Sequence, residues 1–410
     1  MDSKQPPNAR SLWRNGDFLL LWSGQSVSVL GTNISALALP LLVLAVTHSP
    51  AQAGLIAAVQ QLPYLLFSLP AGALLDRWDR KKTMIRCDLL RWIALGSVPL
   101  AYAFGHLTLA QFYIVAFVDG SAFVFFSIAQ IAALPQVVAK DHLPRAYSLT
   151  TMSEYAGQLL GPSLAGFIIG LAPVVVAGAI MVYLLDSASY LVSVITLRFM
   201  RVSFQVERAP AQRSLRRDIA EGLRFLWQQP ILRIMALLAT SGNFLLSSVT
   251  LIVIVLAQGT LHLNVQVLGL IISAGGIGGV LGGFVAPWIR ARLRFGQVMI
   301  GSIFTWLLAI VALAIASSPL VLIAGVGLIG FTWLVYGVTL VSYRLSLSPD
   351  HLQGRVNSAF RFLSYGAEPL GAAFFGLLLS LINPRLVLGL IAAGLAVNGT
   401  VACLTRLRKA

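Results

Sequence analysis

Five acidic side chains fall inside long apolar stretches of this sequence, where a charge is costly and usually functional, and three of them are candidates for carrying protons. Asp119 lies about ten residues into the stretch 109–135, about 15 Å deep at a helical rise of about 1.5 Å per residue. Glu154 lies at a similar depth in the next stretch, and Glu368 lies within a later one. Burial favours the neutral form of a carboxyl group, so such groups can bind and release protons near neutral pH. We expect Glu154 first, then Glu368 and then Asp119 to carry protons, with a structural hydrogen-bonding role as the alternative for each.

Other charged side chains in these stretches have a structural interpretation. Asp88 and Arg91 are three residues apart, so they share a helix face and can pair locally. Asp186 is expected to clamp neighbouring helices. Arg361 lies about one turn inside its stretch, where it can reach the membrane surface or meet a carboxylate. We interpret Asp88, Arg91 and Asp186 as structural charges.

Neutral amides and aromatic rings in the same stretches could contact a bound molecule. Asn33 and Asn243 occupy matching positions in the two halves of the chain, and Gln158 follows Glu154 by one helical turn. Packing or contact with lipid is the alternative for each aromatic ring. The candidates for binding a small molecule are Asn33, Gln60, Gln61, Asn243, Gln158, Phe123 and Tyr336.

Motifs of enzyme chemistry are missing from the sequence. It contains no GxxxxGK[ST] phosphate loop, no HExxH or CxxC metal motif and no GxSxG nucleophile elbow. The five histidines are scattered along the chain. We therefore expect a protein that is not an enzyme and that has no metal site and no cofactor.

The composition is that of a protein folded in lipid. Of the 410 residues, 58% are hydrophobic and 10% are charged, against about 45–50% and about 25% in soluble domains. Only two cysteines are present, which excludes a disulfide scaffold. A polytopic membrane protein remains.

Twelve apolar stretches are long enough to cross a bilayer as helices, since about 20 residues span about 30 Å. They are 18–46, 51–75, 84–105, 109–135, 147–170, 174–198, 232–257, 266–289, 297–316, 319–345, 357–381 and 385–405. The polar segment 199–231 divides them into six and six. We predict an all-α membrane protein with a first bundle over 1–198, a cytoplasmic linker over 199–231 and a second, pseudo-symmetric bundle over 232–410.

Positive charge lies almost entirely on one side of these spans. Of the 29 lysines and arginines, only Arg385 falls on the other side. This bias predicts that both termini are cytoplasmic. It also accounts for the net charge of +15 through anionic lipid, so no nucleic-acid partner is expected. From Ser214 the linker has the pattern of an amphipathic helix on the inner membrane surface, with a regulatory partner site as the alternative.

The two halves of the chain repeat each other. GALLDRWDR from Gly72 matches GGFVAPWIR from Gly282, an offset of 210 residues. DHLPRAYSL and DHLQGRVNSAF return to the same offset after one insertion, so that Arg145 matches Arg355. Because six is even, both halves enter the membrane in the same sense, related by an axis along the membrane normal with a cavity between them.

The segment GALLDRWDRKKTMI, residues 72–85, resembles the signature loop between spans 2 and 3 of the major facilitator superfamily. In that superfamily the loop latches the cytoplasmic side closed, and a glycine there lets helices approach closely. The resemblance implies a major facilitator fold of 12 transmembrane helices and a cytoplasmic gate. The gate residues so implied are Gly72, Asp76, Arg77, Arg80 and Lys81.

A second motif, GQLLGPSLAG at 157–166, is similar to a sequence of drug:proton antiporters in this superfamily. The residues that carry it are Gly157, Gly161, Pro162 and Gly166. The opening pattern LWRNGDFLLLWSGQSVSVLG and the segment SPDHLQGRVNSAF resemble the macrolide-efflux and enterobactin-exporter branch.

These resemblances imply a secondary transporter in a bacterial inner membrane that works by alternating access. It would export amphipathic small molecules, such as drugs or siderophores, in exchange for protons, and we expect it to be a monomer. A lysophospholipid flippase and a proton-coupled importer of the same superfamily are the alternatives.

Overall fold

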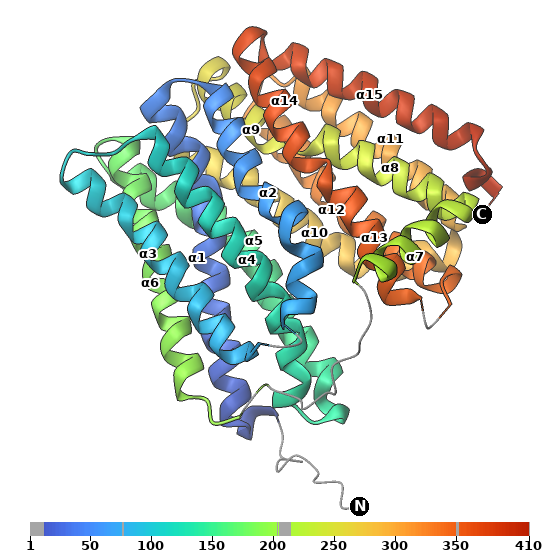
Figure 1. The fold of residues 1–410 in the computed structure, drawn as a ribbon. Helices are drawn as coiled ribbons and strands as arrows, with labels where there is room; N and C mark the ends of the chain where they lie inside the picture. Colours follow the sequence, from blue (N-terminus) through green and yellow to red (C-terminus); the bar gives the residue numbers. More distant parts are fainter. Residues whose placement is uncertain (1–11, 76–77, 203, 205–214, 350–351, 410) are drawn as a thin grey trace, which may run out of the picture.

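A computed structural model describes residues 12–75, 78–202, 204, 215–349 and 352–409 (Figure 1). All regular structure in these ranges is helical. The first bundle consists of α1 (Gly16–Thr47), α2 (Pro50–Leu75), α3 (Arg80–Ala103), α4 (Leu109–Val137), α5 (Leu143–Leu171) and α6 (Val175–Phe199). After α7 (Leu215–Gln228), the second bundle consists of α8 (Pro230–Leu246), α9 (Val249–Val255), α10 (Val265–Arg292), α11 (Phe295–Ala314), α12 (Pro319–Leu347), α13 (Gln353–Gly366), α14 (Glu368–Leu381) and α15 (Pro384–Leu404). Shorter helical turns cover Leu12–Arg14, Lys140–His142, Leu256–Thr260 and Arg406–Lys409.

The predicted all-helical membrane fold is confirmed. Among the described residues, nine helical segments are long and apolar enough to cross a membrane, with Pro230–Thr260 and Gln353–Leu381 each counted as one. α2, α3 and α5, of 26, 24 and 29 residues, occupy the other predicted spans. The helices agree with the predicted spans to within about four residues.

Side-chain caps and prolines determine where several helices begin. Asn15 accepts a hydrogen bond from the backbone N–H of Phe18 at 3.1 Å, and Asn264 does the same for Val267 at 2.9 Å. Proline occupies the first positions of α8, α12 and α15, where its missing N–H costs nothing. The local sequence thus determines where these helices begin.

Two predicted spans are broken rather than continuous. Ser247 and Ser248 interrupt the seventh span between α8 and α9. Ala367 interrupts the eleventh between α13 and α14, two residues before Pro369. Proline removes one backbone hydrogen bond and disfavours helical geometry in the residue before it. Glu368 therefore lies at the start of a new helix, α14.

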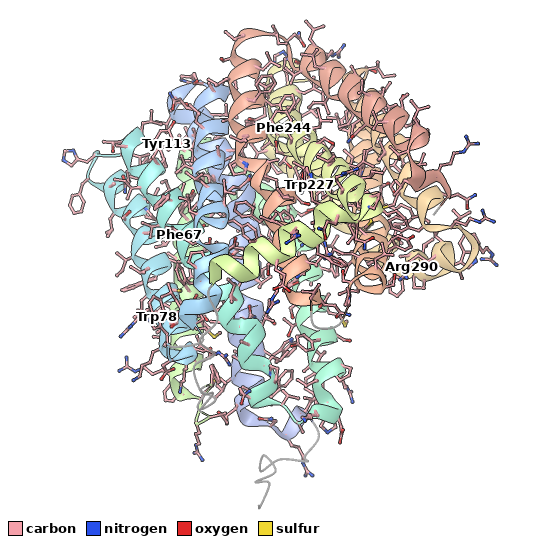
Figure 2. All side chains as sticks on the ribbon, turned by 45° about the vertical axis from the view of Figure 1, so that its right-hand side comes forward. Phe67, Trp78, Tyr113, Trp227, Phe244 and Arg290 are labelled. Carbon is pink, nitrogen blue, oxygen red and sulfur yellow. The ribbon has the colours of Figure 1, made fainter. Side chains whose placement is uncertain are left out.

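Each bundle packs internally and presents apolar side chains outward. In the first bundle α1 packs on α5 and α6, and α3 packs on α4 and α6. In the second bundle α12 packs on both α10 and α11. Large side chains such as Phe284 and Leu404 are 81% and 83% exposed. Figure 2 shows side chains projecting outward around both bundles. A surface of this kind suits lipid rather than water.

The two bundles meet through α5 against α10 and α2 against α14. We call the end of the molecule that carries the loops 78–79, 138–142, 293–294 and 348–349 the basic end, and the other the opposite end. A Cβ atom built on Gly54 would lie 2.5 Å from Cα of Gly376, and one on Gly166 would lie 2.9 Å from Cα of Gly269. Gly54 and Gly269 lie in the first two turns of helices that begin at the opposite end. The bundles are therefore in backbone contact toward the opposite end.

The helix predicted in the linker is present as α7, which packs on α8 and α13. Arg355 of α13 donates a hydrogen bond to the carboxylate of Glu221. Leu226 is buried, whereas Trp227 is 50% exposed at the end of α7 (Figure 2). The linker helix is thus held against the second bundle, and its position on a membrane surface stays a prediction.

Candidate functional site

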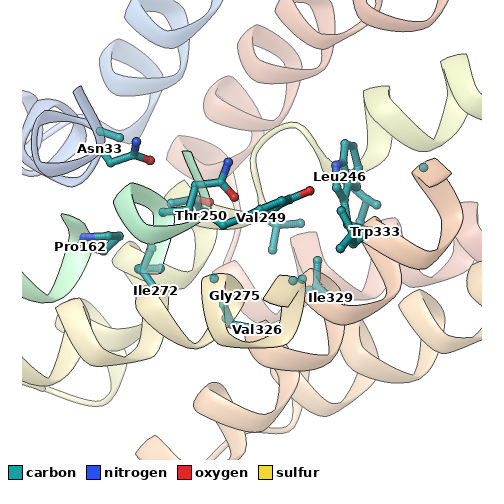
Figure 3. A pocket seen from close by; sticks show the side chains of 18 of the residues that line it. Asn33, Pro162, Leu246, Val249, Thr250, Ile272, Gly275, Val326, Ile329 and Trp333 are labelled. Atoms are coloured by element: carbon teal, nitrogen blue, oxygen red, sulfur yellow. The ribbon is translucent and has the colours of Figure 1, made fainter. Parts of the chain in front are cut away.

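An apolar cavity of about 810 Å³ lies between the two bundles. α1 and α5 line it from the first bundle, and α8, α9, α10 and α12 line it from the second (Figure 3). Ile272, Ile329 and Trp333 form part of its apolar wall, while Asn33 and Gln158 contribute polar groups. Two of the predicted binding residues therefore face this cavity, which we call the apolar cavity.

A second space of about 450 Å³ is lined by charged and polar side chains, and we call it the charged pocket. α2 contributes Gln60 and Gln61 to it. α4 contributes Asp119 and Phe123, and the second bundle contributes Glu368 from α14. Five predicted residues from three distant parts of the sequence are thus brought together between the bundles.

Asp119 is held by an ion pair within the first bundle. Nε of Arg91 donates a hydrogen bond to Oδ1 of Asp119 at 2.7 Å, and Nε2 of Gln60 donates to Oδ2 at 3.0 Å. The side chains of Arg91 and Asp119 are only 5% and 11% exposed. The Arg91 guanidinium also lies 4.1 Å from the ring centroid of Tyr190, a cation–π contact. Both carboxylate oxygens of Asp119 therefore already accept a hydrogen bond in this structure.

The expected local pair of Asp88 with Arg91 is replaced by other partners. Arg91 turns toward α4, and Asp88 instead accepts a hydrogen bond from Oγ of Ser193 on α6 at 2.6 Å. Asp186 accepts from Oγ of Ser189 at 3.3 Å within α6. Asp88 and Asp186 are 0% and 1% exposed and form these contacts inside the first bundle. Asp186 also lines a space of about 310 Å³ that reaches Thr250 and Leu251 of the second bundle.

Glu368 differs from Asp119 in having no such partner. Its half-buried carboxylate faces the charged pocket, and no described residue forms an ion pair or hydrogen bond with it. The helix break before Pro369 places Glu368 at the N-terminus of α14, where a negative charge is favoured. Of the predicted proton carriers, Glu368 is the one that lies between the bundles and has no described partner that would compete with a proton or a bound molecule.

A third space of about 310 Å³ lies between the two just described. It shares Gln60, Gln61 and Asp119 with the charged pocket, and it shares Ala36 and Thr250 with the apolar cavity. We call it the connecting pocket. An elongated molecule could therefore have its polar end in the charged pocket and its apolar body in the apolar cavity.

Glu154 is separated from the other two carboxylates. It is exposed and lines a small pocket of about 110 Å³ with Trp22, Gln25 and Thr151, all from the first bundle. Gln158, one turn further along α5, instead faces the apolar cavity. The structure thus divides the predicted carriers between two places.

Two further predicted binding residues serve packing in this structure. Nδ2 of Asn243 donates to the backbone carbonyl of Ser364 at 2.9 Å, which ties α8 to α13. Tyr336 is 8% exposed, and its ring centroid lies 4.8 Å from that of Trp306 on α11. Neither side chain lines the apolar cavity or the charged pocket.

The predicted gate is only partly described, because Asp76 and Arg77 lie outside the described residues. Arg80 donates to the carbonyl of Ala132 at 3.3 Å, and Nζ of Lys81 donates to that of Met200 at 2.6 Å. These contacts stay within the first bundle. The expected close approach at Gly72 is absent, since no described atom lies within 4 Å of a Cβ built there.

The predicted antiporter-like motif on α5 forms two helix contacts. Gly157 and Gly161 make room for Asn33 of α1, at 2.9 Å and 2.6 Å from a built Cβ. On the other face, Gly166 and the carbonyl of Pro162 pack against Gly269 of α10. The motif therefore joins α5 both to its own bundle and to the other one.

Two features at the interface between the bundles differ from the sequence-based expectation. Arg361 was expected to reach the membrane surface or a carboxylate, but it lines the charged pocket and meets aromatic rings. Ser163 donates to Oγ of Ser273 through its hydroxyl at 2.7 Å and its N–H at 2.9 Å. The signal for Arg361 was a lone cation inside an apolar span, whereas the serine pair left no pattern in the sequence.

Comparisons with known proteins agree with this fold over nearly the whole chain. The profile of the transmembrane secretion effector family matches residues 9–410. The multidrug efflux pump Tap of Mycolicibacterium fortuitum is 27% identical over 404 residues, covering 92% of this chain and 95% of that protein. The enterobactin exporter EntS of Citrobacter koseri is 23% identical over 389 residues, covering 94% and 91%. The crystal structure of the nucleoside transporter NupG is similar with a TM-score of 0.75 at 14% identity, covering 95% and 98%.

Proposed function

The chain belongs to the transmembrane secretion effector family of major facilitator transporters, which are not enzymes, and from that premise we propose that it exports amphipathic small molecules in exchange for protons. The observation that carries the proposal is the charged pocket continuing into the apolar cavity between two bundles that touch toward the opposite end. Relatives that export drugs and enterobactin support the direction of transport.

We place the basic end in the cytoplasm of a bacterial membrane, with 1–198 and 232–410 as the two moving bundles. In this state the contacts of Gly54 with Gly376 and of Gly166 with Gly269 close the opposite end. A molecule would enter from the basic end. Rocking of the bundles would then open the opposite end and bring the gate around Arg80 and Lys81 together.

Glu368 is our choice for the coupling residue, ahead of Glu154 and Asp119. It lies between the bundles without a partner among the described residues, so a proton and a bound molecule could compete for it. Asp119 is already occupied by Arg91 and Gln60. Glu154 is placed in a small pocket of the first bundle.

The test is transport of the dye rhodamine 110 in proteoliposomes, with and without an imposed pH gradient. We expect the wild type and Glu154→Gln to accelerate in the gradient and Glu368→Gln to be indifferent to it. The opposite pattern would transfer coupling to Glu154. Transport by the wild type that ignores the gradient would refute proton exchange.

Two other substrate assignments are separate outcomes of the same assay. Movement of a fluorescent lysophosphatidylethanolamine without movement of dyes would identify a lipid flippase. Accumulation on the side of the basic end, driven by protons from the opposite end, would identify an importer.

A further inference from the structure

Resting on the proposed transport function, we propose that the transported molecule is a zwitterionic amphiphile. Arg361 binds its anionic group, Glu368 binds its cationic group, and the connecting pocket and apolar cavity hold its apolar body. The geometry that points to this class is a cation and a carboxylate in one pocket between the bundles, each without a partner of opposite charge among the described residues.

Arg361 is placed as a binding group rather than as a structural charge. Its guanidinium carbon lies 5.6 Å from the ring centroid of Tyr64 on α2 and 5.7 Å from that of Tyr365 on α13. The two rings pack edge to face, with centroids 5.6 Å apart. These aromatic contacts hold the planar cation in place, and the guanidinium also interacts with the hydroxyl of Tyr64. Its remaining N–H groups can donate to a carboxylate or phosphate.

A second arginine makes this corner of the pocket more positive. Arg344 of α12 is 4% exposed and packs against α13, the helix that carries Arg361. Arg344 donates to Oδ1 of Asn357 at 2.6 Å and lies 4.5 Å from the ring centroid of Phe360. Its Nε is buried with no hydrogen-bond partner among the described residues. Two neighbouring cations without a described carboxylate favour an anion at Arg361.

Glu368 supplies the opposite charge in the same pocket. It follows Arg361 by seven residues across the helix break at Ala367, and both side chains line the same pocket as Tyr64. Arg91 and Asp119, the other charges of the pocket, neutralise each other. The pocket therefore offers one separated pair of unmatched charges, which a zwitterion satisfies and a simple cation or anion satisfies only in half.

Proton coupling follows from the same arrangement. A proton on Glu368 cancels the charge that attracts the cationic group, while Arg361 keeps its charge at all relevant pH values. Protonation from the opposite end would therefore weaken binding of the zwitterion and favour its release. Because proton binding and zwitterion binding oppose each other at Glu368, the two would move in opposite directions across the membrane, as in the proposed exchange.

The test uses two dyes that differ by one methyl group. Rhodamine 110 has a free carboxylate beside its cationic ring system, and rhodamine 123 is its methyl ester, with the positive charge only. Binding of each to the purified full-length protein is measured by fluorescence polarisation. We expect the wild type to prefer rhodamine 110 by about 10- to 100-fold, the effect of a charge-assisted hydrogen-bonded pair.

The variants assign the two charges separately. Arg361→Gln should abolish the preference by weakening only rhodamine 110, and Arg361→Lys should restore part of it. Glu368→Gln should weaken binding of both dyes, because both contain the cationic ring system. Arg292→Gln, which removes an arginine packed on Trp288 outside the pocket, is the matched control and should change neither dye.

Equal affinities of the wild type for the two dyes would overturn the proposal, as would a loss in Arg361→Gln that is the same for both. Failure of the transport function gives a different result. A preference for rhodamine 110 that depends on Arg361, without any dye movement in proteoliposomes, would uphold the recognition site and remove the transport function.

Discussion

Replacing Asp119 by alanine takes away the carboxylate to which Arg91 donates in the interior of the first bundle. The side chains of Arg91 and Asp119 are 5% and 11% exposed, so this is a buried ion pair. Its loss should cost more than that of a surface ion pair, which contributes about 0–1 kcal/mol. Leaving one buried charge unpaired costs about 3–5 kcal/mol. The contact of Arg91 with Tyr190 at 4.1 Å, worth about 2 kcal/mol when desolvated, survives the change and favours the lower part of that range.

A double-mutant cycle of Asp119→Ala and Arg91→Met tests whether the buried pair stabilises the protein. Each single variant should lose stability, and the double variant should regain most of the loss, because replacing a whole buried pair by apolar groups is nearly neutral. The free energy of unfolding is measured by tryptophan fluorescence during SDS unfolding in mixed micelles. A cost below about 1 kcal/mol for Asp119→Ala, or a double variant as unstable as the sum of the singles, would refute a stabilising buried pair.

The remaining predictions concern the contacts between the bundles. Gly54→Val should reduce transport to background, because a Cβ atom at this position would lie 2.5 Å from Cα of Gly376. The control Gly389→Val, at a position with no atom within 4 Å of a built Cβ, should transport normally. Equal activity of the two variants would show that the close contact is dispensable. Ser163→Ala should cost about 0.6 kcal/mol in SDS unfolding and Ser273→Ala about twice as much, since the Ser273 hydroxyl accepts two hydrogen bonds from Ser163. A larger loss of unfolding free energy in Ser163→Ala than in Ser273→Ala would contradict this assignment of hydrogen bonds.

The sequence alone predicted the membrane fold, its order of spans and its family. These are properties that accumulate along the chain, because hydropathy over about 20 residues reports a span wherever its neighbours lie. The motif at 157–166 was predicted as a functional element, and the structure places it at a contact between the bundles. The residues of the charged pocket were also mostly named from the sequence, since polar groups are rare in lipid-facing spans.

Only the tertiary structure decided which charge meets which. Arg91 has Asp88 three residues away, yet it pairs with Asp119 on another helix. Glu154 and Glu368 look alike in the sequence, but one lines a small pocket inside a bundle and the other faces the space between bundles. The physical reason is that helix spacing fixes the face of a residue only relative to its own helix, whereas partners and cavities depend on how each helix is rotated and where, as before Glu368, it breaks.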